Sequence, residues 1–250
     1  MKRRLYIPIL SIFLFSLVHC AETEVVDVNS AQGAFQRGER LAKSERFEEA
    51  IAYFQQVKNK FPYSKYAVAS ELKIANIQFD RERFIEAETD YRLFKEFHPT
   101  HPEIDFVTFR LGLSYFNQLP STIDRDLSIA HKAILYFDEV INSFSESKHV
   151  TEAKRYKQEA LRKLADKEQY IADFYFIRKK YDSALGRYVD LLQKYPNVGL
   201  NKQALYGATI SAYRDKNFAA ARKYFQKLAS TFPDSSERTK AEKELSSGSQ

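Results

Sequence analysis

The stretch FEEAIAYFQQVKNKFP, residues 47–62, decides the fold of this chain because it recurs four more times. The other copies are FIEAETDYRLFKEFHP (84–99), AHKAILYFDEVINSFS (130–145), YDSALGRYVDLLQKYP (181–196) and FAAARKYFQKLASTFP (218–233). Self-similarity of this kind is the signature of proteins that stack one small structural unit many times. The chain is therefore interpreted as an array of repeats.

All five copies share three positions at helical spacing. Each has an alanine at its fourth residue, an aromatic residue four positions later and a larger apolar residue three positions after that: Ala50, Phe54, Val57; Ala87, Tyr91, Phe94; Ala133, Phe137, Val140; Ala184, Tyr188, Leu191; Ala221, Phe225, Leu228. These offsets place the side chains on one stripe of a helix. The alanine lets a neighbouring helix approach, the aromatic ring fills the space beside it, and a proline that closes four copies ends the helix.

The pattern resembles the second helix of a tetratricopeptide repeat, whose unit is a pair of antiparallel helices. A first helix is expected before each copy, with a small residue where the pair must touch: Gly38, Ala75, Gly112, Ala172 and Thr209. An insertion at 117–128 separates the helices of the third pair, and the first helix of the fourth pair is expected over about 149–178. The sequence thus predicts an all-α fold, a right-handed superhelical solenoid of five tetratricopeptide-like helix pairs.

Residues 1–19 are interpreted as an export signal. Three cations at 2–4 precede an apolar run at 5–18, which is shorter than the about 20 residues of a membrane-spanning helix. A buried N-terminal helix is the alternative. The segment ends in Leu-Val-His-Cys at 17–20, which resembles the lipobox of bacterial lipoproteins, although His19 stands where Gly, Ala or Ser is usual. We expect Cys20, the only cysteine, to carry a lipid that attaches the chain to a membrane.

The remaining composition is that of an ordinary helical protein. Three of the 39 basic residues lie in the signal, which leaves 36 cations against 33 acidic residues. This mild, mixed charge argues against a nucleic-acid partner. We expect a lipidated cysteine and linker at 20–30, repeats 1 to 3 at 31–147, repeats 4 and 5 at 148–245, and a disordered tail at 246–250.

No catalytic constellation is found in the sequence. It contains no GxSxG or HExxH motif and no phosphate-cradling glycine-rich loop. His98 and His101 have a spacing seen in metal sites, but Pro99 and Pro102 place them in a turn without a third ligand nearby. We interpret them as turn and helix-cap residues. The chain is expected to be no enzyme and to use neither metal nor cofactor.

The first helices of repeats 1 to 3 carry a strip of phenylalanines that should line the concave face of the solenoid. Concave faces of repeat arrays bind peptides and partner domains. Packing between repeats is the alternative role for any one of these side chains. As a set they predict a groove that accepts aromatic side chains, lined by Phe35, Leu72, Asn76, Phe79, Phe106, Phe109 and Phe116.

Three segments are more specific than the repeats. They are FHPTHPEIDFVTFRLGLSYF (97–116), IDRDLSIAHKA (123–133) and LADKEQYIADFYFIRKKYDSALGRYVDLLQKYP (164–196). With them, the chain resembles the BamD family from about residue 35 to residue 235. Members of that family are lipoproteins of the machinery that folds β-barrel proteins and inserts them into the outer membrane. Ser145 in place of the third proline and the missing proline after Asp126 depart from the family pattern.

The resemblance implies a lipid-anchored, non-catalytic adaptor on the periplasmic face of the outer membrane. Its first three repeats would bind the aromatic-ended C-terminal segments of unfolded barrel proteins, with Tyr66 and Arg110 added to the groove. Its last two repeats would dock the periplasmic domain of BamA, beside the other BAM lipoproteins. For that docking we expect Arg187, Lys194 and Lys202, although solvated surface charge is the alternative role.

Other exported repeat lipoproteins remain as alternatives. One is the envelope protein of the Tol-Pal system, which usually has a coiled coil before its repeats, for which 21–30 is too short. The others are a pilus-assembly protein and a regulator of cell-wall hydrolases. The partners that co-purify with the chain discriminate among these hypotheses.

Overall fold

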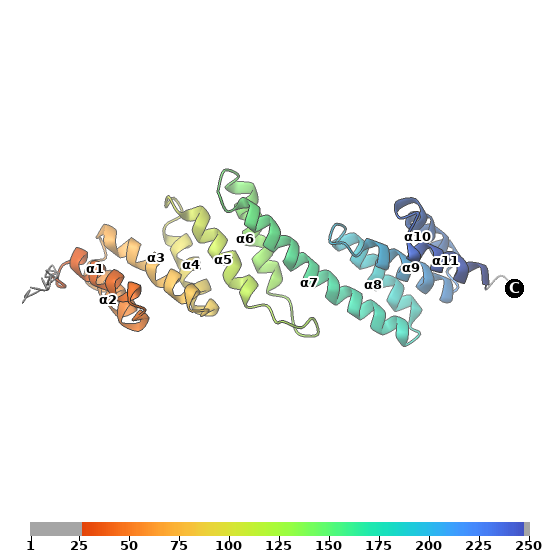
Figure 1. The fold of residues 1–250 in the computed structure, drawn as a ribbon, viewed down its shortest axis with the longest axis horizontal. Helices are drawn as coiled ribbons and strands as arrows, with labels where there is room; N and C mark the ends of the chain where they lie inside the picture. The colour runs from red at the N-terminus through yellow and green to blue at the C-terminus, as the bar shows by residue number, and fades with distance from the viewer. Residues whose placement is uncertain (1–26, 248–250) are drawn as a thin grey trace, which may run out of the picture.

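The computed structural model describes residues 27–247 as eleven α-helices in an elongated row (Figure 1). The first helices of the pairs are α1 (Ala31–Lys43), α3 (Lys65–Asp80), α5 (Ile104–Asn117), α7 (Val150–Ile177) and α9 (Asn201–Arg214). Their partners are α2 (Phe47–Lys60), α4 (Phe84–Phe97), α6 (Ala130–Ser143), α8 (Tyr181–Lys194) and α10 (Phe218–Thr231), and α11 (Ser236–Ser247) follows. The prediction of an all-α solenoid of five helix pairs is confirmed.

The three shared positions of each copy form the core. In the first four copies the alanine, the aromatic ring and the larger apolar side chain are all buried, and only Phe225 of the last copy is partly exposed. The small residues act as predicted in two pairs. A Cβ on Gly38 would lie 2.7 Å from the ring of Phe54, and one on Gly112 would lie 2.8 Å from the ring of Phe137. Each ring therefore packs directly on the backbone of the paired helix.

Every second helix ends at an aromatic or imidazole residue with an extended φ. These C-cap residues are Phe61, His98, Phe144, Tyr195 and Phe232. Proline follows in four cases, where it cannot continue the helix. Helix α6 ends at the same register although Ser145 stands in the proline position, because the N–H of Phe144 still bonds the carbonyl of Val140. The departure at Ser145 thus leaves the loop geometry unchanged.

Helix α7 is twice as long as its counterparts, with 28 residues against 14 in α5 and α9, as the sequence predicts. It runs obliquely across the middle of the array and joins the two halves (Figure 1). The insertion between α5 and α6 lies against it, since buried Leu127 of the insertion clusters with Leu164 of α7. The insertion is therefore part of the packed structure.

Helix α11 closes the C-terminal end of the described chain. Its Ala241 is buried in a cluster with Leu205, Ile210 and Leu228. The helix includes Ser246 and Ser247, two residues of the expected tail, and residues 248–250 lie outside the described part. The expected signal at 1–19 and the lipid site at Cys20 also lie outside it. Among residues 27–247, none of the helices is both long and apolar enough to cross a membrane.

Candidate functional site

A groove of 740 Å³ lies between the first helices of repeats 1 and 2. Its floor is apolar, with Phe47 and Phe54 from α2 and Ile77 from α3. Polar side chains of α1 and α3 form the walls: Gln36, Glu39, Arg40, Lys43, Lys73, Asn76 and Asp80. An apolar floor with a few polar groups around it is typical of ligand sites.

A second hollow of 260 Å³ continues this groove toward repeat 3. It shares Lys73 and Asn76 with the first and adds the largely buried Leu72. Its other lining residues are Lys65, Val68, Ala69, His101 and Glu103. We call the two adjoining hollows the N-terminal groove. Because they extend over α1, α3 and the turn before α5, they offer an elongated surface.

The walls of the N-terminal groove carry both signs of charge. Lys73 pairs with Glu39 across the groove, with 2.9 Å between Nζ and the carboxylate oxygen. Arg40 and Lys43 lie in the last turn of α1, where cations also interact favourably with the helix dipole. Asp80 at the end of α3 lies 3.5 Å from a guanidinium nitrogen of Arg110. Such mixed walls suit a polypeptide better than a strongly charged ligand.

Asn76 is held in place by a buried partner. The hydroxyl of Tyr91 donates to Oδ1 of Asn76 at 2.6 Å, and Tyr91 is fully buried. Burial raises the pKa of Tyr91 far above its ordinary value, so the hydroxyl stays a neutral donor. Because Oδ1 is occupied, the amide nitrogen of Asn76 is the group that can donate to a ligand in the groove.

Arg110 is fixed on an aromatic pair. Its guanidinium carbon lies 4.2 Å from the ring centroid of Phe79 and 5.3 Å from that of Phe106. Cation–π contacts of this kind hold the cation near the ring face. The structure thus brings together three residues of the predicted groove, next to Asp80 on the wall of the first hollow.

The other predicted groove residues pack mainly within the protein. Phe35 and Phe109 are buried core side chains, with 8% and 4% exposed, and Leu72 is 6% exposed. Phe116 packs edge-on against Tyr156, and Tyr66 packs on Phe35 with 5.4 Å between the centroids. For Phe35 and Phe109 the alternative role, packing between repeats, is what the structure shows. A neighbouring repeat covers the side of each first helix on which these rings lie. The number of phenylalanines in the sequence does not reveal that this side is covered.

The sequence reading missed most of the wall residues of the groove. Gln36 and Arg40 lie two positions before and after Gly38 on α1, and Lys73 lies two positions before Ala75 on α3. These offsets place the side chains on the face of the first helix that points away from its partner helix. The small residue of each first helix was therefore the signal that could have located them.

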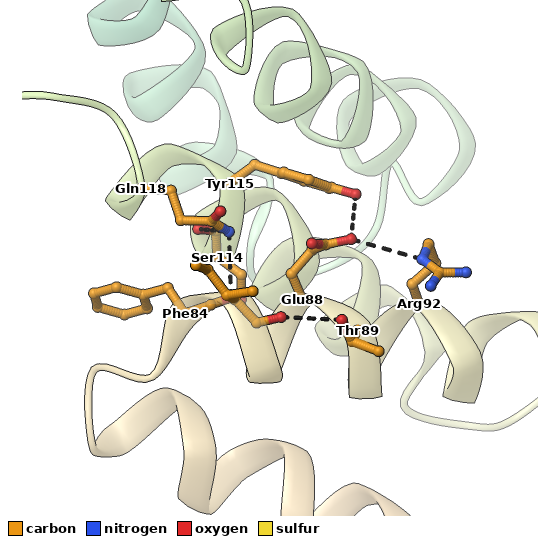
Figure 2. Close-up of polar contacts among 8 residues, drawn as sticks. Phe84, Glu88, Thr89, Arg92, Ser114, Tyr115 and Gln118 are labelled. Atoms are coloured by element: carbon orange, nitrogen blue, oxygen red, sulfur yellow. Dashed lines mark hydrogen bonds and ion pairs between the residues drawn. The ribbon is translucent and has the colours of Figure 1, made fainter.

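A polar cluster between α4 and α5 ties repeats 2 and 3 together. Figure 2 shows the hydroxyl of Tyr115 donating to Glu88 at 2.6 Å, with Arg92 on the other side of the same carboxylate at 3.6 Å. Nε2 of Gln118 donates to the carbonyls of Phe84 and Ser114. These contacts fix α5, which carries Arg110, relative to the helices that form the groove.

The cations predicted for partner docking each have a carboxylate of their own chain. Arg187 lies 3.2 Å from Glu168 of α7, and Lys194 lies 3.0 Å from Asp190 within α8. Lys202 lies on α9, 3.4 Å from Glu237 of α11. Exposed pairs of this kind contribute little to stability and can exchange partners. Their role in docking stays a prediction.

His98 and His101 both pack against the ring of Phe94, at 4.8 and 5.0 Å between centroids. Nε2 of His98 lies 2.8 Å from Glu71, and Nδ1 of His101 accepts the N–H of Glu103. Both are turn residues, and His98 is the C-cap of α4, as interpreted from the sequence. Within the part of the chain that the structure describes, no group of three or more His, Cys, Asp or Glu residues is placed to hold a metal ion.

The stacked helix pairs define a tetratricopeptide-repeat protein. A tetratricopeptide model matches residues 203–235. A second family model, described as an outer membrane lipoprotein and called YfiO, matches residues 27–207. The chain belongs to this family of outer membrane lipoproteins, and the resemblance to the BamD family is confirmed.

The curated relatives bear the name outer membrane protein assembly factor BamD. The protein of Neisseria meningitidis is 23% identical over 206 residues, which cover 76% of this chain and 77% of the relative. That of Rickettsia prowazekii is 24% identical over 201 residues, with 80% of each chain covered. Among solved structures, the TPR2AB domain of yeast Sti1 in a complex with pHSP90 covers 86% of this chain and 84% of its own, with a TM-score of 0.44 and 14% identity.

Proposed function

We propose that this chain is a non-catalytic adaptor of the outer-membrane β-barrel assembly machinery. It binds the C-terminal segments of unfolded barrel proteins in the N-terminal groove and docks the periplasmic domain of BamA through repeats 4 and 5, with other BAM lipoproteins as neighbours. The observation that carries the proposal is the groove itself, an elongated apolar floor between polar walls. The names of the relatives, outer membrane protein assembly factor BamD, support the assignment to this machinery.

The chemistry of the groove suits an extended segment that ends in an aromatic residue. Phe47 offers apolar contact for its side chains, and the buried Phe54 and Ile77 lie beneath it. The amide nitrogen of Asn76 donates to a backbone carbonyl of the segment, because Tyr91 already occupies Oδ1. Arg40, on the open wall, pairs with the terminal carboxylate.

The anchor would set where this binding happens. A lipid on Cys20 would hold the chain on the periplasmic face of the outer membrane, so that captured segments stay near the barrel subunit. Tethering raises the effective concentration of a second binding event, to the order of millimolar for short linkers. Modest affinity in the groove is therefore sufficient, and it allows the segment to be released.

The groove is tested by fluorescence anisotropy with a labelled C-terminal peptide of an outer-membrane barrel protein. Arg40→Glu should weaken binding about tenfold, because a paired cation is replaced by an anion, a change worth roughly 1.4 kcal/mol per factor of ten. Arg222→Glu on the exposed face of α10 is the matched charge reversal and should leave binding unchanged. Amidation of the peptide's carboxylate should reduce the effect of Arg40→Glu. Equal affinity of all three proteins would rule out this groove.

The docking half is tested separately by affinity purification from detergent-solubilised membranes. The wild-type chain should recover BamA, and the double variant Arg187→Glu with Lys194→Glu should recover less of it. Arg155→Glu with Lys154→Glu on the exposed first half of α7 is the control pair. Failure of the wild-type chain to recover BamA would refute a role in this machinery.

A further inference from the structure

Helix α7 acts as a first helix twice. Its first half packs on repeat 3, where Ala153 joins the core of that repeat, Tyr156 stacks on Phe137 at 5.9 Å and Lys157 pairs with Asp138. Its second half forms the fourth pair with α8 and also contacts α9. Because the first half of α7 packs on repeat 3, the second half lies away from the repeat that precedes it.

Backbone conformation gives the register for comparing the repeats. The turn between paired helices contains one residue with φ between 58° and 63° in four repeats: Glu45, Glu82, Lys179 and Lys216. Each lies seven positions after the small residue of its first helix. Equivalent positions of the first helices can therefore be aligned without ambiguity.

One aligned position shows which surface of the second half of α7 is left without a covering helix. Two residues after the small residue stand Ile77, Ser114 and Ser211 in repeats 2, 3 and 5, with 6%, 0% and 0% exposed. The second helix of the preceding repeat packs beside each of these first helices. In repeat 4 the same position is Phe174, with 40% exposed. The side chain is large and apolar where its covering helix is missing.

In the described chain, the first helix of repeat 1 also has no helix of a preceding repeat beside it, but its side chains at the equivalent positions are polar. These three positions hold polar or charged residues that line the N-terminal groove: Gln36, Arg40 and Lys43. In repeat 4 these positions are Tyr170, Phe174 and Ile177, with 51%, 40% and 76% exposed. We call these three residues the α7 apolar face.

Cations surround one end of the α7 apolar face. Arg178 stacks over Phe174, with 3.6 Å from its guanidinium carbon to the ring centroid, and exposed Lys179 and Lys180 follow directly. At the other end, Nζ of Lys167 donates to the carbonyl of Arg125 and holds the insertion against α7. The face is thus bounded by the insertion on one side and by three consecutive cations on the other.

We propose that the α7 apolar face docks an amphipathic helix of a partner protein, apolar along one side and acidic where it meets Arg178, Lys179 and Lys180. In repeats 2, 3 and 5 the position equivalent to Phe174 is buried beside the second helix of the preceding repeat, so a helix fits the space that is open at this position in repeat 4. The three cations supply the charge complementarity. The proposal is independent of peptide capture in the N-terminal groove and of the docking cations on α8 and α9.

The test places a photo-crosslinking residue at position 174 of the full-length chain in its own membrane. A matched residue at position 135 of α6 is the control, since Leu135 is also an exposed apolar side chain, 62% exposed. Mass spectrometry of the crosslinked peptide identifies the contact. The expected product at 174, and not at 135, joins the chain to an apolar helical face with flanking Asp or Glu. Crosslinks to lipid alone, to a second copy of this chain, to an extended segment, or none at all would overturn the proposal.

A charge test accompanies the crosslink. Lys179→Glu with Lys180→Glu should reduce the yield at 174 at least threefold, while Arg222→Glu with Lys223→Glu on exposed positions of α10 should not. Circular dichroism of each variant establishes that the helices remain folded. An unchanged crosslink yield for Lys179→Glu with Lys180→Glu would refute the proposal that the partner helix is acidic at this end. Peptide binding in the N-terminal groove should be the same in all variants, so failure of one proposal is distinguishable from failure of the other.

Discussion

The ring of Phe54 occupies the space that a Cβ on Gly38 would need. An ideal Cβ there would lie 2.7 Å from Cε1 and 3.0 Å from two further ring carbons. Phe54 is fully buried, so its ring has no room to withdraw. The close approach of α1 and α2 depends on this contact. The shape of the N-terminal groove, whose lining includes Phe54, therefore depends on it too.

Replacing Gly38 by alanine should destabilise the first repeat by about 1–3 kcal/mol, as overpacking of a filled core does. Gly186→Ala is the control, because a Cβ there meets nothing within 4 Å on the exposed side of α8. That change should stabilise the protein by roughly 0.5–1 kcal/mol through helix propensity. Urea unfolding followed by circular dichroism measures both, and shifts of the same sign would contradict the packing argument.

The turns between paired helices contain a second testable feature. Glu82 has φ of 58°, a left-handed conformation that costs a non-glycine residue about 1–2 kcal/mol. Glu82→Gly should therefore raise the urea midpoint. Gly199, with φ of 80°, is the opposite case, and Gly199→Ala should lower the midpoint although its new Cβ would have an ordinary contact distance of 3.5 Å to Arg162. Unchanged urea midpoints in both variants would contradict this prediction, because they would mean that the turns adjust their backbone conformation to either residue without a cost in stability.

The hydrogen bond between Tyr91 and Asn76 should contribute to stability and to peptide binding. Tyr91→Phe leaves the Oδ1 atom of Asn76 without this donor, which should cost about 1 kcal/mol. Tyr170→Phe removes a hydroxyl from an exposed ring and should change stability by less than about 0.5 kcal/mol. The peptide anisotropy assay should show weaker binding for Tyr91→Phe only. Full affinity in that variant would mean that Asn76 does not need to be oriented.

His149 should make folding sensitive to mildly acidic pH. Its ring stacks on Phe109 at 4.9 Å, and burial lowers the pKa of His149 although Asp105 acts in the opposite direction. The folded state therefore favours the neutral ring. Below about pH 6.5, the ordinary value, the unfolded chain takes up a proton that the folded chain does not, so stability falls as the pH falls.

This pH dependence is measured as the urea midpoint at pH 7.5, 6.5 and 5.5. His149→Phe keeps an aromatic ring on Phe109 and has no proton to gain, so its midpoint should fall less between pH 6.5 and 5.5. At pH 7.5 both proteins have an uncharged ring at this position and the comparison gives the baseline. Parallel curves for the two proteins would assign the loss of stability to carboxylates instead.

The candidate site was less predictable from the sequence than the fold was. Asn76 lines the N-terminal groove and Arg110 lies beside it, whereas Phe35 and Phe109 are core residues. All four lie on first helices. A helix in a solenoid has neighbours on both flanks, and periodicity alone does not distinguish a flank covered by the next repeat from the flank that faces the groove.

The sequence by itself determined the helix pairs, because their signals are local. Alanine, an aromatic ring and an apolar side chain at helical offsets define one packing stripe, and a proline after the C-cap residue marks the end of four of the five second helices. Only the tertiary structure decided which surfaces remain open. Whether Phe174 is covered depends on where α7 leaves repeat 3, and the lining of the groove depends on how closely α2 approaches α1. Both are set by contacts between side chains far apart in the chain, which no single helix encodes.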